Sequence, residues 1–454
     1  MKRIGIKRMI RIEIKQLVLA VIWVLMMVTQ AGCKGSVLDA RPEFVKKSGI
    51  LSDMKMLTQP KASDGKHMAS STLALSPDGK YLAATAGGME YLVIWDVPAE
   101  KVIRKIPGKS QSYQLTGDRV VFSPDGKYLA AGMFVGRGNP LKNYVQIRSS
   151  GDSIDIKNDF EGEKSKGKKA LPDPGPVVAI FSIPEFELVQ LAGAQLSRSQ
   201  LFQFSPDGRY LILDGRGGSL APSPKKMLDL IDTRTWESVR QVNDVPRAVD
   251  WEFTSDGKYL VDLYVDRSDF TLQKSQDGSR EFKKYYSDLR VWDIETLRLE
   301  KTFERFIHGE ALVSGGGKGR ISFSPTDQNY TITFIKRRHT AEGKVVNDSA
   351  YMLSVDFWSE NISRTEVITP YPVAGFRRYT PDGRYYICMG RNYRIKKDLI
   401  QIYTKDGKEL EQVSLPVTPF AYNGTLSANG KVLAYSWAHR IFLWRINSIE
   451  VEEN

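Results

Sequence analysis

The chain has 454 residues, of which 41% are hydrophobic, 10% aromatic and 26% charged. These values are those of ordinary folded proteins and exclude a chain that is disordered throughout. Sixty-five Lys and Arg against 53 Asp and Glu give a formal net charge of +12, and part of this charge belongs to a short N-terminal segment that has to be considered first.

Residues 1–33 have the residue order of an export signal. Six basic residues and Glu13 precede an unbroken apolar run of twelve residues, Leu17 to Val28. As a helix, this run would span only ~18 Å of a hydrocarbon core that is ~30 Å thick, so it predicts a signal peptide and not a stable membrane anchor. Without residues 1–33 the chain keeps 59 basic and 52 acidic residues, a net charge of +7.

Ala31-Gly32-Cys33 follows the apolar run and resembles the end of a bacterial lipoprotein signal, in which the Cys becomes the lipidated first residue of the mature chain. The sequence departs from that family at Gln30, where an aliphatic residue is usual. Simple cleavage after Ala31 and an uncleaved anchor stay open as alternatives. The resemblance implies lipidation of Cys33 and a location in the cell envelope, on its periplasmic or outer-surface side. Cys388 then has no disulfide partner, and we expect it to be a small buried hydrophobe.

After a linker predicted at residues 34–53, one four-residue motif recurs seven times between apolar runs. Its full form is Ser-Pro-Asp-Gly, and weaker copies occur at 324–327 and 427–430. Pro presets the backbone of a tight turn, Asp hydrogen bonds within the turn, and Gly supplies a positive φ. We therefore predict hairpin corners with structural roles for Asp78, Gly79, Asp125, Gly126, Asp207, Gly208, Asp256, Gly257, Asp382 and Gly383.

Strand-like runs follow each corner. Residues 80–84 and 127–131 are examples, and a second hairpin comes next in each unit, as at 92–96 and 289–293. The corners are at least 47 residues apart, close to the ~40–50 residues of a four-stranded propeller blade. The pattern predicts an all-β chain built from repeated four-stranded units.

Trp95-Asp96 and Trp292-Asp293 resemble the signature dipeptide of the WD-repeat family of β-propellers. The resemblance covers about residues 55–448 but lacks the Gly-His pair of that family, so a periplasmic propeller similar to TolB stays open. Either resemblance implies a single propeller of seven four-stranded blades at 54–448, closed by an N-terminal strand near Met54 to Leu57. Residues 449–454 are then a C-terminal tail.

The connections between the second and third strands vary in length, whereas the corners do not. We predict inserted loops at 135–176 (in blade 2), 214–227, 264–288, 336–350 and 390–398, which together carry 24 basic and 15 acidic residues. Insertions gathered on one face of a repeat protein usually mark its binding face. The candidate binding residues are Lys164, Lys166, Lys168, Lys169, Lys283, Lys284, Lys336, Arg337, Arg338, Arg391, Arg394, Lys396 and Lys397. The alternative is that solvated loops are simply rich in Lys.

Motifs for catalysis, metal binding or cofactor binding are not found in the sequence. The four His residues lack metal-ligand spacing, no Gly-x-Ser-x-Gly elbow occurs, and the Gly-rich stretch 315–319 precedes a strand instead of opening a helix. We expect no catalytic residue, metal or cofactor, and an export signal argues against nucleic acid as a partner.

The functional expectation is a non-catalytic protein-binding or scaffold module, held at the membrane by its lipid. Its partner would be an envelope protein or an acidic envelope ligand. The alternative is a propeller enzyme, a lyase or hydrolase that acts on an envelope carbohydrate at the axial mouth. The oligomeric state stays open.

Overall fold

In a computed structural model of the chain, two compact units are distinguished, Met1–Glu43 and Phe44–Asn454. The structure describes residues 42–61, 70–86, 90–108, 113–135, 145–150, 153–158, 176–192, 198–216, 226–245, 248–274, 281–308, 320–323, 330–339, 345–355, 373–392, 397–404, 408–415, 423–437 and 439–447. All regular elements in these ranges are strands, and none of the described residues forms a helix that could span a membrane.

The strands form antiparallel sheets in chain order. The first two sheets are β3 (Ser70–Leu75), β4 (Tyr81–Ala86), β5 (Tyr91–Asp96), β6 (Lys101–Pro107), and β7 (Tyr113–Phe122), β8 (Tyr128–Val135), β11 (Pro176–Ser182), β12 (Leu188–Ala192). A separate hairpin, β9 (Val145–Ser150) and β10 (Ser153–Asn158), is inserted between β8 and β11. Next come β13 (Arg198–Phe204), β14 (Tyr210–Arg216), β15 (Lys226–Asp232), β16 (Glu237–Val245), and β17 (Ala248–Phe253), β18 (Tyr259–Lys274), β19 (Glu281–Asp293), β20 (Leu299–His308).

The remaining sheets differ in strand number. One has three strands among the described residues: β21 (Arg320–Phe323), β22 (Tyr330–His339) and β23 (Val345–Val355). The next has five: β24 (Val373–Tyr379), β25 (Tyr385–Asn392), β26 (Lys397–Thr404), β27 (Glu409–Leu415) and β1 (Glu43–Lys46), which adds to β27. In the last, β28 (Asn423–Leu426), β29 (Val432–Trp437) and β30 (Arg440–Ile446) are joined by β2 (Leu51–Thr58).

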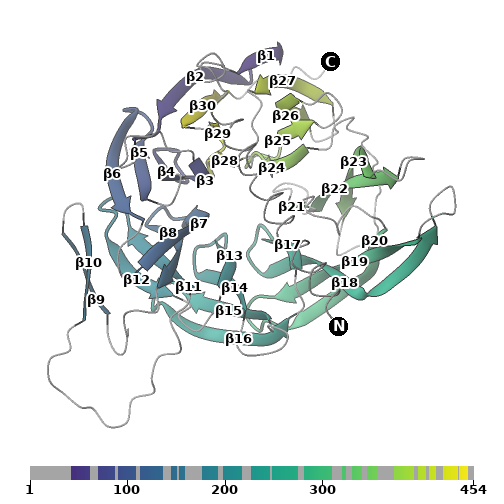
Figure 1. Cartoon of the computed structure of the whole chain (residues 1–454), viewed down its shortest axis with the longest axis horizontal. Coiled ribbons are helices and arrows are strands. Elements are labelled where there is room, and N and C mark those ends of the chain that lie inside the picture. The colour runs from purple at the N-terminus through teal and green to yellow at the C-terminus, as the bar shows by residue number, and fades with distance from the viewer. Residues whose placement is uncertain are drawn as a thin grey trace, which may run out of the picture. The chain divides into compact units, whose positions relative to one another are not determined.

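In each sheet, the strand that precedes the corner lies innermost, next to the corresponding strand of the neighbouring sheet (Figure 1). Contacts between successive innermost strands join β3 to β7 and β7 to β13. They also join β17 to β21, β21 to β24, β24 to β28, and β28 to β3. Strands β13 and β17 are linked by a hydrogen bond from Gln203 to Glu252. The innermost strands therefore share a common axis, and the sheets radiate from it.

The corners share one hydrogen-bonding pattern. In six of them the hydroxyl of the first residue donates to the Asp or Asn side chain two residues on, at 2.5–2.7 Å. The same carboxylate or amide oxygen accepts the backbone N–H of a basic residue at 2.9–3.1 Å. The glycines have φ between +69° and +76°, which only Gly adopts without strain. The corner at 324–327 lies outside the described residues.

Successive corners also contact each other. An added Cβ on Gly208 would lie 3.8 Å from Cδ of Pro124, and one on Gly430 would lie 2.6 Å from Cδ of Pro381. The last corner bonds the first directly, because the backbone N–H of Asn429 donates to the carbonyl of Pro77 and its side-chain amide donates to the carbonyl of Asp78 at 2.8 Å. An Asp side chain could not donate this second bond.

The turn into each outermost strand is also repeated, with a non-glycine residue at positive φ. These residues are Glu100, Phe186, Trp236 and Leu297, with φ of 49–59°. Phe186 packs edge-on against Tyr81 of the preceding sheet at 5.3 Å between ring centroids, and Trp236 packs against Tyr128 at 5.0 Å. The side chains of Phe186 and Trp236 therefore supply packing between sheets that Gly could not supply.

Each of these outermost strands then carries a β-bulge. The pairing shifts by one residue at Ile103, Val189, Val239, Glu300 and Leu410. A bulge twists an edge strand and interrupts its free hydrogen-bonding edge, which discourages edge-to-edge pairing.

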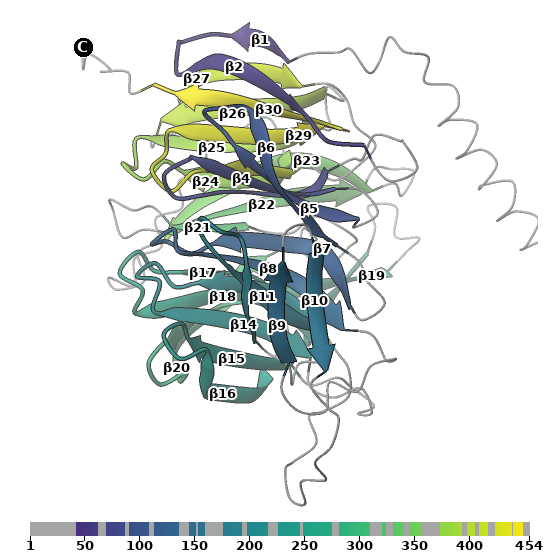
Figure 2. The ribbon, with the colours of Figure 1, turned by 90° about the vertical axis from the view of Figure 1, so that its left-hand side faces the viewer.

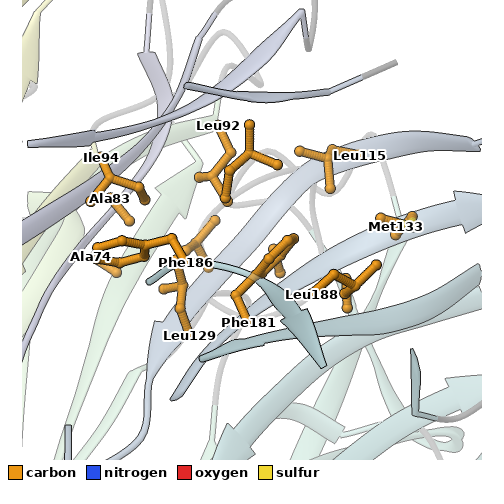
Figure 3. Close-up of a cluster of buried hydrophobic side chains, with 14 residues drawn as sticks. Ala74, Ala83, Leu92, Ile94, Leu115, Leu129, Met133, Phe181, Phe186 and Leu188 are labelled. Carbon is orange, nitrogen blue, oxygen red and sulfur yellow. The ribbon is translucent and has the colours of Figure 1, made fainter. Parts of the chain in front are cut away.

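The core consists of the apolar residues between neighbouring sheets. Figure 3 shows one such cluster, in which Ala74, Ile94 and Leu92 from the first sheet meet Leu129 and Phe181 from the second. These side chains are almost completely buried. Strands such as β4 and β5 are buried on both faces and are therefore continuously apolar instead of alternating.

Two N-terminal strands pack against C-terminal ones. In β2, Leu57 pairs with Ile441 and Leu51 with Ile446. The buried carboxylate of Glu411 in β27 accepts bonds from the hydroxyl of Ser48 and the backbone N–H of Ile50, both at 2.9 Å. The predicted linker at 34–53 therefore contains β1 and the start of β2.

The inserted segments differ from the prediction as well. Residues 264–288 are predicted as a loop, but β18 continues to Lys274 and β19 begins at Glu281, with Thr271 paired to Lys284. Similarly, 336–350 lies mostly in β22 and β23, and 135–176 contains β9 and β10. Charged side chains suggested loops, whereas a hairpin that extends past its neighbours can carry charges on both solvent-facing sides.

Candidate functional site

Three polar side chains occupy the same position on innermost strands. Gln203 in β13, Glu252 in β17 and Arg378 in β24 each stand two residues before the Ser or Thr that opens the corner. Because the strand ends at the corner, this position lies near the corner end of the axis. The other sheets have Ala74, Val121, Ser322 and Thr425 at this position, so the three long polar side chains belong to β13, β17 and β24.

A hydrogen-bonded network joins these residues to Arg119 of β7. Arg119 donates to Oε1 of Gln203 at 3.2 Å, and Nε2 of Gln203 donates to Oε1 of Glu252 at 2.9 Å. Arg378 reaches Oε2 of Glu252 at 2.7 Å from β24, two sheets further along the chain. We call Arg119, Gln203, Glu252 and Arg378 the axial cluster.

The side chain of Arg119 reaches this network because its strand is irregular. The pairing of β7 with β8 shifts between Leu115 and Val120, so that the regular register skips residues 116–119. The guanidinium of Arg119 lies 5.9 Å from the ring centroid of Trp251, at the distance of a cation–π contact. The indole of Trp251 is buried, and its Nε1 has no hydrogen-bond partner among the described residues.

The two ends of the axial ion pair differ in exposure. The side chain of Arg378 is 41% exposed, whereas that of Glu252 is 12% exposed. The guanidinium is therefore more accessible to a ligand in solvent than the carboxylate is. Both carboxylate oxygens of Glu252 already accept hydrogen bonds, which suits the residue to holding Arg378 and Gln203 in place. A guanidinium offers five donors and can bind a carboxylate or phosphate group.

Among the described residues, no three His, Cys, Asp or Glu side chains lie close enough together to hold a metal ion. Cys388 is buried and free of disulfide bonds.

Seven of the predicted basic residues lie on strands that the structure describes, at the end of these strands opposite the corners. Lys283 and Lys284 lie in β19, Lys336, Arg337 and Arg338 in β22, and Arg391 in β25, all on strands and not in loops. Their side chains are outside the described part of the structure, whereas Lys397 is exposed at the start of β26, paired with Asn392. Cys33, Lys164, Lys166, Lys168, Lys169, Arg394 and Lys396 lie outside the described residues altogether.

Sequence reasoning did not identify the axial cluster. Its members are single residues on four strands that carry other polar residues as well, and they come together only when four sheets surround one axis. The available signal was a polar residue at one fixed offset before the corner, present at Gln203, Glu252 and Arg378 but not at Ala74 or Val121.

Comparisons with known proteins show the fold. A chain of a crystal structure titled as the mitotic checkpoint complex matches 90% of this chain and 94% of its own length, with a TM-score of 0.52 and 13% identity. A chain of hydrazine synthase from Kuenenia stuttgartiensis matches 86% of this chain and 97% of its own, with a TM-score of 0.51 and 16% identity. No family model and no curated protein sequence matches. The structural similarity supports the β-propeller predicted from the repeats.

Proposed function

We propose that this chain is a seven-bladed propeller whose last blade is completed by β2, and that it acts as a non-catalytic binding or scaffold module of the bacterial cell envelope. Pairing of β2 with β30 and the two bonds from Asn429 to the first corner support ring closure. The charged segment before Leu17 and the Ala31-Gly32-Cys33 sequence support export and lipidation at Cys33.

One observation carries the binding role, namely that the two ends of the sheets differ in uniformity. At the corner end, six turns have the same hydrogen bonds. At the opposite end, β9 and β10 are inserted in one sheet, β18 and β19 extend far in another, and β4 and β5 are joined by a short connection (Figure 1). Variable elements on a rigid repeated scaffold are the usual location of partner binding.

The partner would be an envelope protein or an acidic envelope ligand. A β-propeller gives a rigid frame for such contacts, and the extended hairpins carry Lys283, Lys284, Lys336, Arg337 and Arg338 in strands. Basic side chains at this end would favour an acidic partner surface and would make association dependent on salt.

Capture experiments with charge variants test this role. Mature protein would be used to isolate partners from detergent-solubilised envelope, beside a Lys283→Glu/Lys284→Glu variant and a matched Lys80→Glu/Lys431→Glu variant of the corner end. We expect the first variant to lose a partner that the second keeps. Equal capture by both variants would remove the extended hairpins from the binding surface.

Two further measurements address anchoring and the enzymatic alternative. Exchange of Cys33 for Ser should release the protein from membranes and remove the acyl mass. A propeller enzyme that acts on an envelope carbohydrate would use the axial cluster, since it holds the described carboxylate nearest the axis that also contacts two other blades. Carbohydrate turnover that is abolished by Glu252→Gln would support the enzyme over the scaffold.

A further inference from the structure

The outermost strands of the propeller divide into two groups by charge. On β1, β2 and β6, with the residues directly beside them, the basic residues are Lys46, Lys47, Lys55, Lys101, Arg104 and Lys105, and the acidic ones are Glu43, Asp53 and Glu100. On the turns and described side chains of β12, β16 and β20, the basic residues are Arg234, Arg240, Arg298 and Lys301, and the acidic ones are Glu185, Glu187, Glu237, Glu295, Glu300 and Glu304. The first group thus has six basic and three acidic residues, whereas the second group has four basic and six acidic residues.

The strands of the first group are neighbours. Strand β1 is bonded to β27, β2 to β30, and the innermost strands of these sheets contact each other and β3, the first strand of the sheet that ends in β6. Lys55 of β2 forms an ion pair with Glu100 beside β6 at 2.7 Å. Figure 2 shows β1, β2 and β6 on the same side of the propeller. We call this surface the basic rim strip.

Two of the acidic residues in the strip already have basic neighbours. Glu100 is paired with Lys55, and Asp53 lies 3.7 Å from Arg445 of β30. Lys46, Lys47, Lys101 and Lys105 are exposed. The outward charge of the strip is therefore positive. Nζ of Lys46 donates to the backbone carbonyl of Glu409, whereas Lys101 and Lys105 can reach across a flat surface on their flexible stems.

Exposed apolar side chains accompany these lysines. Val45 is 59% exposed and Ile103 45% exposed, with Phe44 and Met54 also exposed. Nζ of Lys47 lies 5.2 Å from the ring centroid of Phe44. Val189 and Val239 are also exposed on the second group of strands, which we call the acidic rim, so exposed apolar residues alone do not distinguish the two groups. The first group differs from the second in its exposed aromatic ring, Phe44, and in its positive charge.

The strip also comes first in the chain after the proposed lipid site. Phe44 lies eleven positions after Cys33, and at ~3.5 Å per residue this stretch spans at most about 38 Å. A single acyl anchor binds only marginally, and stable attachment usually needs a second signal such as basic residues. Basic residues near an anionic leaflet, with apolar side chains that enter the headgroup region, supply such a signal.

We propose that the basic rim strip is a membrane-docking surface for anionic phospholipid, which places the propeller with its rim on the bilayer. Both the corner end and the extended-hairpin end of the axis then face along the membrane and stay open to partners. This inference rests on the proposed export and lipid anchor for its setting, but it concerns a surface that acts without the acyl chain.

Vesicle binding of the unacylated protein tests the proposal. The chain from Lys34 to Asn454 keeps every strand of the structure, and its folding would be checked by circular dichroism. Sedimentation with phosphatidylcholine vesicles, with and without phosphatidylglycerol, measures binding at low and high salt. We expect binding that requires phosphatidylglycerol and weakens as salt rises.

Matched variants identify the surface. Lys46→Glu/Lys105→Glu should weaken binding at least about tenfold, because each basic residue near an anionic surface contributes about 1 kcal/mol. Arg240→Glu/Arg298→Glu makes the same change of net charge on the acidic rim and should leave binding within about twofold. Phe44→Ser should reduce the binding that persists at high salt.

Three outcomes would overturn the proposal: equal binding to vesicles with and without phosphatidylglycerol, equal loss in both charge variants, or no binding at all. The last outcome would favour an acidic protein as the partner of the strip. None of them would affect partner capture at the extended hairpins or release by Cys33→Ser, so failure of this inference is distinguishable from failure of the proposed function.

Discussion

The sheets β3–β6 and β17–β20 share their turns but differ in their interiors. Both have a hydrogen-bonded corner, a Trp-Asp dipeptide at the end of the third strand and a residue with positive φ before the fourth. Two residues before the Trp, however, Val93 pairs with Ala84 in the first sheet, whereas Arg290 pairs with Asp262 in the other. The repeated sequence therefore determines the turns and the contacts between blades, whereas the paired residues in the interior of each sheet can differ.

The interior pair changes the surroundings of the Trp. In the sheet with the ion pair, Nε1 of Trp292 donates to Asp262 at 3.2 Å, and Arg290 lies over the rings of Tyr264 and Trp292. In the apolar sheet, Nε1 of Trp95 has no hydrogen-bond partner among the described residues. An interior of Ala and Val has no polar side chain that needs a partner. A buried ion pair, by contrast, is tolerated only if both charged groups have their partners.

The largest expected effect comes from breaking that ion pair. Asp262→Ala would leave Arg290 buried without its bidentate partner, and we expect a loss of about 3–5 kcal/mol in the free energy of unfolding. Asp262→Ala/Arg290→Val copies the apolar sheet and should recover most of this loss. Urea unfolding measures both. If the double variant is no more stable than the single one, the two interiors are not interchangeable.

A corner glycine should give the next largest effect. Gly430→Ala would bring a Cβ to 2.6 Å from Pro381 at a φ of +71°, so both a clash and backbone strain arise, and we expect a loss of about 2–4 kcal/mol. Gly126→Ala has the same φ, but its nearest neighbour is 4.0 Å away, and it should lose only about 1–2 kcal/mol. Thermal unfolding of the two variants separates the clash from the strain. Equal losses would show that contact between corners contributes nothing.

Most of the architecture could be predicted from the sequence because turn chemistry is local. The side-chain bonds of Ser76 and Asp78 and the positive φ of Gly79 lie within one short segment, so the motif can be recognised without the fold. The axial cluster could not be predicted, since Arg378 and Glu252 are 126 positions apart in the sequence and meet only across the axis. The hairpin at 264–288 was also missed, because a long connection between two strands does not by itself reveal that the strands continue into it.

A buried carboxylate should make stability depend on pH. Burial raises the pKa of Asp229 above its ordinary value, although the hydroxyl of Ser238 donates to it and offsets part of the shift. The folded state therefore binds this proton more tightly than the unfolded state, and stability falls as pH rises from about 4 through the raised pKa. Asp229→Asn should be more stable than the natural chain at pH 7 and should flatten that slope. Identical slopes in denaturant titrations at pH 4 to 7 would exclude Asp229 as the cause.

The smallest effect concerns the turns with positive φ. Glu100→Gly relieves backbone strain but loses an exposed ion pair with Lys55, and the two should nearly cancel, within about 0.5 kcal/mol. Trp236→Gly loses its packing on Tyr128 and should cost about 2 kcal/mol. Differential scanning calorimetry of both variants shows whether the stability of the fold depends on the side chain or on the backbone conformation at these turns. A stabilised Trp236→Gly would remove the role given to packing between sheets.

The pairing of β2 with β30 has a consequence for the order of events during synthesis. Leu57 meets Ile441, so the sheet that holds the beginning of the chain can be completed only when almost all of the chain has arrived. A growing polypeptide thus keeps β2 without its strand partner until Arg440–Ile446 has been synthesised. Chains cut short before Arg440 would leave β2 without a partner and expose Leu51 and Leu57 to proteases.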